Sequence, residues 1–301
     1  MPEPLVSIVL PLYNGRPFIE ETLRSVSEQN FQEAELVVVD DGSTDDGPAF
    51  VQEFCRADAS PILKSLRLIR EENAGVAAAR NRGIKESAGK YIALLDQDDL
   101  WENDRLSAMV ASLAAEGTRW GYSAFYRFYA DGRKVLKADG SPDRKETLVK
   151  IVEGRLFIPP SAALIEKALL EEIKGFVPEF APSDDWDLFL KLAEKEKGSY
   201  VPEPLVRFRS HKTSTGKRQR DRIFMAQREV LKLHEEILKS LVPLSSLRYR
   251  EGSIHLHLAQ VSCEKGLRKE AGEHFKISLK ARPFRVKTWS KYIKFLLGMK
   301  I

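Results

Sequence analysis

The residues of this sequence best suited to metal chemistry lie in the stretch "YIALLDQDDLW", residues 91–101. Its first five residues are apolar or nearly so, which predicts a buried strand. Asp96, Asp98 and Asp99 then place three carboxylates within four positions. Like charges at the end of a buried strand repel one another. A surface turn tolerates such a run, whereas a bound cation would make it necessary.

Two of these acids have a spacing that suits a metal site. Alternate side chains of an extended segment point to the same side, so Asp96 and Asp98 face one way. Mg²⁺ and Mn²⁺ prefer carboxylate oxygens, and they take only one or two from protein while sharing the phosphates of a substrate. We therefore expect one carboxylate to hold the cation and the other to hold a ribose or the waters of the metal.

Two further acidic clusters are candidates for binding and catalysis. The stretch "VVVDDGSTD" (37–45) closes a strand into a turn, which explains part of its composition, but a carboxylate there can also accept the N–H of a nucleotide base. The stretch "SDDWDL" (183–188) opens a helix, where the helix dipole favours acids. Together with Trp186 it also suits a site where a sugar ring stacks and a carboxylate deprotonates a hydroxyl.

The elements that must position these acids alternate between strands and helices. Strand-like runs cover 7–13, 34–41, 66–72 and 91–96, and the segments between them have helical periodicity. This order predicts a doubly wound, Rossmann-like α/β layer with a mainly parallel sheet, whose ligands bind beyond the carboxyl ends of the strands. The sequence lacks G-x-G-x-x-G near the first strand and lacks a P-loop, which argues against dinucleotide and P-loop binding.

Beyond residue 120 the pattern is less regular. A hairpin is predicted over 121–140, with its turn at Asp131-Gly132. From residue 217 the sequence predicts a long amphipathic helix, and 252–285 contain one tetratricopeptide-like helical hairpin. We therefore predict a catalytic domain over 1–215 and a basic helical region over 216–301, which packs on the catalytic domain or on a second subunit as a homodimer.

Charge is distributed unevenly along the chain. Residues 205–301 hold 23 Lys and Arg against 8 Asp and Glu, whereas residues 1–204 hold 25 and 36. The last stretch, 281–301, interleaves basic and aromatic residues, which predicts a helix lying on an anionic membrane surface. The alternative is that its apolar residues pack on the catalytic domain and its charges face water. We expect no binding to nucleic acid, because the alternation of aromatic and basic residues in the tail is thin and the catalytic half of the chain is acidic.

From the composition we expect a cytoplasmic protein, whose contact with the membrane, if any, is peripheral and on the cytoplasmic face. We find neither an apolar run long enough for a membrane span nor a basic leader, and we expect no signal peptide. Cys55 and Cys263 lie far apart in helix-like stretches, so we expect two small buried side chains rather than a disulfide.

Five motifs, in order along about residues 5–211, resemble those of the family 2 glycosyltransferases. They are "VSIVLPLYNG", "ELVVVDDGSTD", "NAGVAAARNRGI", "GKYIALLDQDD" and "SDDWDLFLKL". The resemblance implies an inverting, hexosyltransferase-type enzyme on the GT-A fold that uses a nucleotide-diphosphate sugar, with UDP-sugar favoured, and Mn²⁺ or Mg²⁺. It also implies a saccharide or lipid-linked saccharide acceptor in cell-surface polysaccharide synthesis.

The resemblance also implies roles for single residues. Those assigned to nucleotide binding are Pro11, Tyr13, Asn14, Asp41, Arg80, Asp96 and Gln97, with Asp41 and Arg80 at the base and Asp96 at the ribose. Asp98 is the metal ligand, and His211 in "VRFRSH" is similar to a histidine that joins it on the metal. Asp185 is the catalytic base. Asp184, where relatives often carry Glu, supports it, with Trp186 on the acceptor side.

Two other functions share some of these features. A nucleotidyltransferase has the same α/β layer and acidic metal site, but it would carry a Gly-, Arg- and Lys-rich phosphate loop where this chain has "LPLYNGRPF". A non-catalytic sugar-nucleotide-binding protein is the second alternative. The intact Asp96, Asp98 and Asp185 argue against it.

Overall fold

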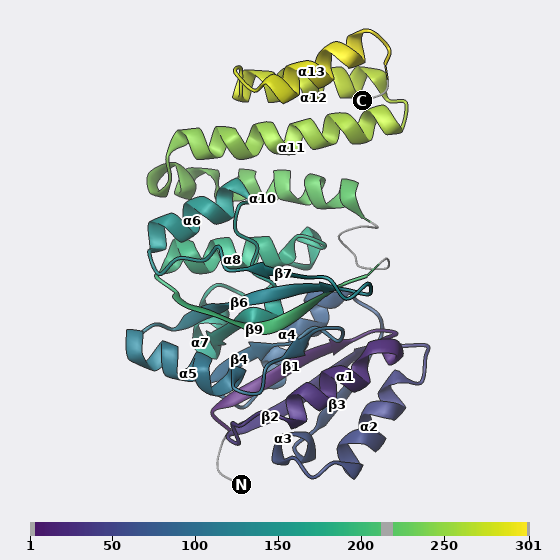
Figure 1. The fold of residues 1–301 in the computed structure, drawn as a ribbon, viewed down its shortest axis with the longest axis vertical. Coiled ribbons are helices and arrows are strands. Elements are labelled where there is room, and N and C mark those ends of the chain that lie inside the picture. The colour runs from purple at the N-terminus through teal and green to yellow at the C-terminus, as the bar shows by residue number, and fades with distance from the viewer. Residues whose placement is uncertain (1–3, 212–218, 300–301) are drawn as a thin grey trace.

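A nine-stranded sheet organises the molecule, which the computed structural model describes over residues 4–211 and 219–299 (Figure 1). Its strands follow the order β3-β2-β1-β4-β8-β6-β9-β5, and β7 pairs with β6. The strands are β1 (Val6–Leu12), β2 (Ala34–Asp41), β3 (Arg67–Glu71), β4 (Tyr91–Leu94), β5 (Leu100–Trp101), β6 (Trp120–Tyr129), β7 (Lys134–Lys137), β8 (Ala163–Glu166) and β9 (Ser199–Ser210). Helices cover both faces of this sheet, which confirms the predicted α/β class.

The first four strands form a parallel layer. β1 lies between β2 and β4 and is parallel to both, and β3 is parallel to β2. Every residue of β1 and β2 is buried, as expected of strands covered on two faces. Helices α1 (Arg16–Ser27), α2 (Gly47–Ala57) and α3 (Pro61–Lys64) pack on one face, and α4 (Val76–Glu86) packs on the other. The prediction of parallel strands with crossover helices is confirmed, although β4 ends at Leu94, before Asp96.

The rest of the sheet is mixed. β8 is antiparallel to β4 and β6, and β9 is parallel to β6 but antiparallel to β5. β6 and β7 form the hairpin predicted at Asp131-Gly132, where the φ of 82° suits glycine. Helix α5 (Arg105–Glu116) packs on the α1 side, and α6 (Arg144–Glu153), α7 (Lys167–Glu172) and α8 (Asp184–Lys195) pack on the α4 side. The pairing of β5 with β9 brings the end of β9 beside the acidic turn that follows β4.

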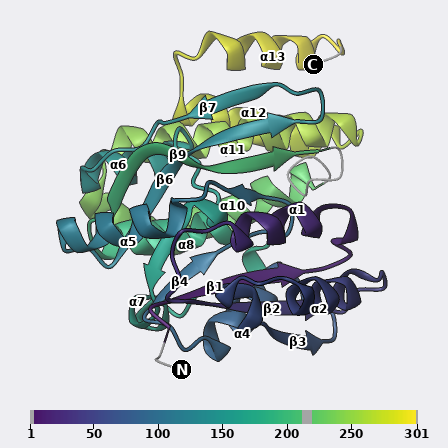
Figure 2. The same ribbon diagram turned by 60° about the horizontal axis from the view of Figure 1, so that its bottom comes forward.

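Four helices extend the molecule away from the sheet. They are α10 (Arg220–Leu241), α11 (Leu244–Glu264), α12 (Arg268–Ala281) and α13 (Val286–Leu296). α10 packs on α8 and α11 packs on α6, while α13 is the outermost helix (Figures 1 and 2). The predicted boundary near residue 215 lies outside the described residues. Within 4–211 and 219–299, none of the helices is both long and apolar enough to span a bilayer.

A buried ion cluster joins the helical extension to α8. His234 of α10 lies between two carboxylates of α8, with Nε2 2.9 Å from Asp187 Oδ1 and Nδ1 2.8 Å from Glu194 Oε1. Lys191 Nζ lies 2.8 Å from the other oxygen of Asp187. Burial lowers the pKa of His234, but the two carboxylates outweigh it and raise that pKa to about 9. His234 is therefore protonated at neutral pH and holds α10 against the helix that begins at Asp184.

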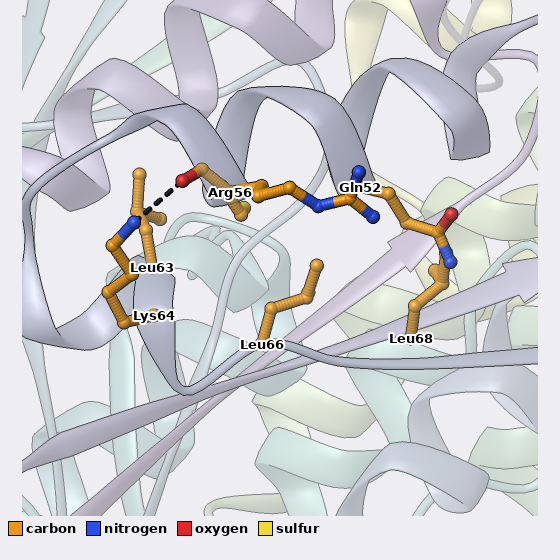
Figure 3. Close-up of a pocket in the computed structure, with 7 residues that line it drawn as sticks. Gln52, Arg56, Leu63, Lys64, Leu66 and Leu68 are labelled. Atoms are coloured by element: carbon orange, nitrogen blue, oxygen red, sulfur yellow. Dashed lines mark hydrogen bonds between the residues drawn. The ribbon is translucent and has the colours of Figure 1, made fainter.

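A hollow of about 380 Å³ lies between α2, α3 and the start of β3 (Figure 3). Its lining residues are Gln52, Cys55, Arg56, Leu63, Lys64, Leu66 and Leu68. The hollow lies near the start of β3, whereas the acidic turns follow the ends of β2 and β4. The hollow is therefore separate from the acidic residues. Both cysteines are free; Cys55 is buried as predicted, whereas Cys263 is only partly buried. Burial raises the pKa of the Cys55 thiol to about 12, which leaves it unreactive.

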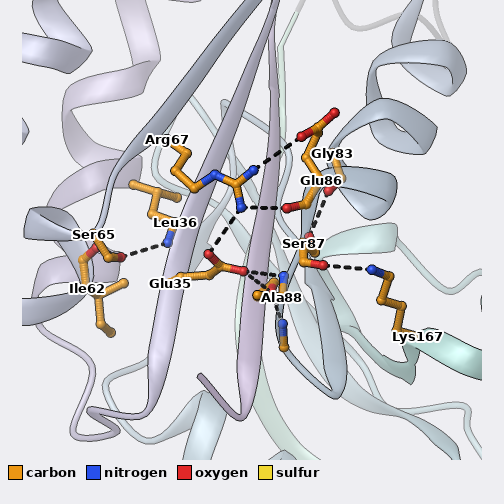
Figure 4. A network of polar contacts seen from close by, with 12 residues as sticks. Glu35, Leu36, Ile62, Ser65, Arg67, Gly83, Glu86, Ser87, Ala88 and Lys167 are labelled. Carbon is orange, nitrogen blue, oxygen red and sulfur yellow. Dashed lines mark hydrogen bonds and ion pairs between the residues drawn. The ribbon is translucent and has the colours of Figure 1, made fainter. Parts of the chain in front are cut away.

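A polar network fixes the loop that leads into β4 (Figure 4). The buried Glu35 carboxylate accepts from Ser7 Oγ at 2.5 Å and from the backbone N–H of Ala88 at 2.7 Å. The guanidinium of Arg67 lies 3.7 Å from Glu35 and 3.2 Å from Glu86. These contacts tie the loop to β1, β2 and β3, and so they set the register of β4 and the position where Asp96 follows it.

Replacing His234 by Gln should destabilise the protein in a pH-dependent way. The folded pKa is about 9, above the ordinary value of 6.5, so the protonated histidine stabilises the fold fully below about pH 6.5 and loses this effect as pH rises through about 9. We expect the free energy of unfolding in urea to fall by on the order of 3 kcal/mol near pH 6 and by much less near pH 10. Lys232→Gln on the same helix is the control. A pH-independent difference would contradict this role.

Candidate active site

The three carboxylates of the acidic turn have three different sets of partners. Asp96 Oδ1 accepts from the guanidinium of Arg80 at 2.6 Å. Asp98 Oδ2 lies 2.7 Å from Nε2 of His211, which follows β9. Asp99 is almost fully buried, and its oxygens accept from Ser161 Oγ at 2.6 Å and from the backbone N–H of Arg209 at 2.9 Å. The like charges are therefore directed apart.

Burial raises the pKa of Asp98 and, more strongly, that of Asp99. For both carboxyls a neighbouring aspartate adds to the effect, and for Asp98 the contact with His211 opposes it. Asp99 has no exposed oxygen to offer a ligand, since it is buried and bonded to Ser161 and Arg209. The third carboxylate of the run is thus a structural residue, and the pair that faces the site is Asp96 and Asp98.

Residues that the sequence did not single out hold the backbone of this turn. Ser161 Oγ accepts from the backbone N–H of Asp96 at 3.1 Å, and Arg209 Nε donates to the carbonyl of Asp98 at 2.8 Å. Thr22 Oγ1 of α1 lies 2.9 Å from the carbonyl of Gln97. These residues come from three distant parts of the chain. Arg209 lies in the stretch "VRFRSH" that was quoted for His211, but no sequence signal indicated its contact with the turn, nor those of Ser161 and Thr22.

Asp98 and His211 have the donor atoms that a divalent cation takes from protein. The carboxylate oxygen and the imidazole nitrogen already face each other, and the His211 ring is packed beside Phe18, with centroids 4.8 Å apart. Within 4–211 and 219–299, no group of three or more His, Cys, Asp and Glu side chains is arranged to hold a metal. A donor set of two side chains fits an ion such as Mn²⁺ or Mg²⁺ that shares substrate phosphates.

Side-chain amides join the end of β1 to the acidic turn and to the loop after β2. The backbone N–H of Tyr13 donates to Gln97 Oε1 at 2.8 Å, and Gln97 Nε2 donates to the Tyr13 carbonyl at 3.0 Å. Asn14, with a φ of 48°, accepts from the backbone N–H of Thr44 at 2.8 Å. Tyr13 itself is exposed, whereas Pro11 is buried inside β1. Gln97 and Asn14 therefore shape the loops, and Tyr13 presents a ring to solvent.

Asp41 is engaged by the segment that begins α4. Its two carboxylate oxygens accept from the backbone N–H groups of Ala74 at 2.7 Å and Gly75 at 2.9 Å. Gly75 has a φ of 92°, which favours glycine at this position. Asp41 thus joins β2 to α4 and is nearly buried, so a base would reach it only at the edge of its carboxylate.

Arg80 lies at the centre of the site rather than at its edge. It is nearly fully buried, and it donates to Asp96 at 2.6 Å and to Asp184 Oδ2 at 3.1 Å. Burial lowers its pKa, but the two carboxylates outweigh burial and raise the pKa above its ordinary value. Both of these hydrogen bonds go to acids of the protein, so Arg80 bridges the acidic turn and the start of α8.

The first turn of α8 brings the second group of acids to this bridge. Asp184 is nearly buried against Arg80, while Asp185 is partly exposed and accepts from the backbone N–H of Trp186 at 2.7 Å. Burial, aided by the charge of Asp184, raises the pKa of Asp185 to about 7, although Arg80 opposes the shift. A carboxyl with this pKa can exchange a proton near neutral pH.

Trp186 does not have the surroundings expected of a sugar-stacking residue. Its Nε1 donates to the carbonyl of Ile151 in α6 at 3.0 Å, and the guanidinium of Arg250 from α11 lies 4.7 Å from its ring centroid. The ring therefore packs among α6, α8 and α11. Trp186 was a candidate because it follows two acids in the sequence. Consecutive side chains of a helix point in different directions, so this adjacency does not place the indole with those acids.

Replacing Arg80 by Gln should leave Asp96 and Asp184 without their shared cation. Removing one partner of a buried ion pair costs about 3–5 kcal/mol, and we expect a loss of this size in the free energy of unfolding measured with urea. Arg82→Gln is the matched control on the same helix, because its side chain is half-exposed, and we expect a change within about 0.5 kcal/mol. Equal effects of the two substitutions would contradict the bridge.

The family described as glycosyl transferase family 2 matches residues 7–174, more than half of the chain. A Bacillus subtilis relative, TuaG, is named as a teichuronic acid biosynthesis glycosyltransferase. It is 28% identical over 239 residues, which cover 77% of this chain and 90% of TuaG. Other relatives are longer, and the matched segment covers about a fifth of glycosyltransferases from three Rickettsia species.

Two solved structures share the fold. TarS of S. aureus, residues 1–349, superposes with a TM-score of 0.67 at 19% identity, covering 93% of this chain and 82% of that one. The mannosyltransferase PcManGT of Pyrobaculum calidifontis, solved with GDP-Man and Mn²⁺, gives a TM-score of 0.63 at 21% identity, covering 98% and 80%. These likenesses confirm the expected GT-A-type fold with a helical C-terminal extension.

The family match spans the parallel layer, the acidic turn and β8, which together position Asp96, Asp98 and Arg80. This match, together with relatives named as glycosyltransferases, decides against the nucleotidyltransferase that the sequence left open. This chain is a glycosyltransferase and belongs to glycosyl transferase family 2.

Proposed function

We propose that this enzyme transfers a sugar with inversion from a UDP-sugar to a saccharide or lipid-linked saccharide during cell-surface polysaccharide synthesis. The donor is supported by TarS, which shares the fold at a TM-score of 0.65 and was solved with UDP-GlcNAc, and by a second TarS complex with UDP. The acceptor class is supported by the name of TuaG, which refers to teichuronic acid biosynthesis.

The observation that carries this proposal is the meeting of two acidic groups on one guanidinium. Arg80 contacts Asp96 in the turn after β4 and Asp184 at the start of α8. Asp185, the next residue along α8, is close enough to this bridge for the charges of Arg80 and Asp96 to act on its pKa. A transferase of this kind needs a carboxylate that accepts a proton on one side of the anomeric carbon and a site for the diphosphate on the other.

Asp185 is the proposed general base. It removes the proton of the acceptor hydroxyl as that oxygen attacks the anomeric carbon, and the nucleoside diphosphate leaves from the opposite face, so the configuration inverts. A base is most effective when its pKa lies near the working pH, and the pKa of about 7 meets this condition. Asp184 contributes by its negative charge, which keeps the proton affinity of Asp185 high.

The donor end of the site lies where β1, β2 and the acidic turn meet. We assign the exposed ring of Tyr13 to the nucleotide, with Asn14 and Gln97 holding the loops around it. Gly15 supports this arrangement, since a Cβ there would lie 2.3 Å from Oε1 of Gln97. Asp96 has the exposed edge needed to accept from a ribose hydroxyl.

Asp98 and His211 would hold the divalent cation. Mn²⁺ in the PcManGT structure supports this choice, as does the donor chemistry of an oxygen and a nitrogen 2.7 Å apart. When bound, Mn²⁺ or Mg²⁺ compensates the negative charge that develops on the leaving diphosphate. Arg209 keeps the backbone of Asp98 in place through its contact with the carbonyl.

Replacing Asp185 by Asn should stop transfer while nucleotide affinity stays nearly unchanged. Loss of a general base lowers the rate about 10²–10⁴-fold, with little effect on ground-state binding. The turnover number and the dissociation constant for UDP, measured by calorimetry, separate the two effects. A matching loss of UDP affinity would make Asp185 a binding residue instead.

The pH profile of the wild-type enzyme provides a second test of the base. Asp185 acts when ionised, so transfer should rise with pH and level off above about pH 7. The charged groups that act on it are Asp184, Asp96 and Arg80. Asp184→Asn removes the largest like charge and should move the midpoint to lower pH. An unchanged midpoint would exclude Asp184 from this role.

Replacing Asp98 by Asn should remove the Mn²⁺ dependence of donor binding. The amide lacks the charge that holds the cation, so the affinity for UDP should become the same with and without Mn²⁺. Calorimetric titration of UDP in Mn²⁺ and in chelator measures this directly, with Glu102→Gln as a control acid outside the turn. Retention of the full Mn²⁺ effect would show that Asp98 is not a ligand.

The proposed function as a whole is tested with a panel of nucleotide sugars. We expect UDP-sugars, in the presence of Mn²⁺, to raise the melting temperature and to be hydrolysed slowly in the absence of an acceptor. Preference for a GDP-sugar would keep the transferase but overturn the choice of UDP.

A further inference from the structure

Helix α13 has one face that packs on the protein. Thr288 is fully buried, and Phe295 lies against Phe275 of α12 with ring centroids 5.3 Å apart. The guanidinium of Arg268, also from α12, lies 4.8 Å from the centroid of Phe295. This face accounts for part of the aromatic content of the last stretch, as the packing alternative predicted, although the contacts are with α12 rather than with the sheet domain.

The other face of α13 is apolar and open to solvent. Its residues recur every three to four positions, which places them along one side of the helix. They are Val286, Trp289, Ile293, Leu296 and Leu297, and they are between 44% and 79% exposed. Phe284, just before the helix, is 95% exposed. A contiguous apolar surface of this kind on a folded protein marks an interaction site.

The surroundings of this apolar face are basic. The sequence has no Asp or Glu after Glu273, whereas eight Lys and Arg follow it. Lys287 and Lys294 are exposed and lie seven residues apart, so both flank the apolar face on the same side of the helix. An occupant that covers the apolar side chains must therefore also meet positive charge.

We propose that this face of α13 docks on the surface of an anionic lipid bilayer. Aromatic and aliphatic side chains of such a helix enter the boundary between headgroups and acyl chains, while lysines remain among the anionic headgroups. The position of α13 suits this contact, because Figures 1 and 2 show it as the outermost helix at one end of the molecule. A flat surface can reach it without meeting the sheet domain.

A second copy of the chain fits this face less well. Pairing α13 with α13 would bring Lys287 and Lys294 of both copies close together, and this segment supplies no acid to neutralise them. An anionic headgroup layer supplies the missing charge and also a place for Phe284 and Trp289. The proposal concerns where the enzyme is held, and it does not depend on the identity of the donor or the acceptor.

Vesicle flotation of the full chain tests this proposal. We expect binding to vesicles of phosphatidylcholine with phosphatidylglycerol, weaker binding when salt is raised, and little binding to phosphatidylcholine alone. Lys287→Gln with Lys294→Gln should weaken partitioning about 25-fold, since each basic residue near an anionic surface contributes about fivefold. Ile293→Ser with Leu296→Ser should abolish it, because the apolar side chains that enter the bilayer are gone.

Matched substitutions elsewhere separate membrane contact from general effects. Leu233→Ser with Ile237→Ser changes two exposed apolar residues of α10, and Lys85→Gln with Lys90→Gln changes two exposed lysines near α4. Both double variants should bind like the wild type. All α13 positions chosen are exposed, so folding and UDP binding should be unchanged in every variant.

Three outcomes would overturn the proposal. The first is failure of the full chain to float with anionic vesicles at low salt. The second is a dimer, seen by light scattering without lipid, that Ile293→Ser with Leu296→Ser dissociates; the occupant would then be a second copy. Equal binding by the α13 variants and their matched controls would also assign the membrane contact to another surface.

Discussion

The arrangement of the active site depends on one buried cation. Arg80 in α4 is nearly fully buried, and a buried guanidinium is stable only when anions face it. Asp96 and Asp184 supply them from positions 16 and 104 residues away along the chain. The same contact that neutralises Arg80 therefore brings the acidic turn and the start of α8 together. Asp185 lies near the same bridge, since the charges of both Arg80 and Asp96 act on its pKa.

The acidic turn can carry three neighbouring aspartates because the fold treats each of them differently. Asp99 is withdrawn into the interior, where Ser161 and Arg209 take up both of its oxygens. Asp96 is neutralised by Arg80, and Asp98 remains beside His211. The turn thus keeps Asp96 and Asp98 at the site, and each of its three carboxyls has partners of its own. Three adjacent aspartates would destabilise a loop by repulsion, and in this turn a separate partner for each of them offsets that cost.

The helical extension contacts α8 at one end, and its other end lies far from the sheet. His234 binds two carboxylates of α8, the helix whose first residues include Asp185, so the extension supports the element that carries the proposed base. At its far end, α13 packs on α12 by one face and exposes the other. The excess of positive charge over residues 205–301 belongs mostly to this extension, whereas the excess of negative charge belongs to the part of the chain that precedes it.

The sequence by itself determined the parallel layer and the polar residues at its strand ends. Apolar runs such as those of β1 and β2, helical periodicity between them and the resemblance of five motifs are local patterns, and local patterns can be read from consecutive residues. Only the tertiary structure decided how the side chains are paired. Arg80 bridges Asp96 and Asp184, Trp186 packs among helices, and Asp99 is structural. Such roles depend on contacts between residues far apart in the chain, because burial and the choice of an ion partner exist only once the elements have packed together.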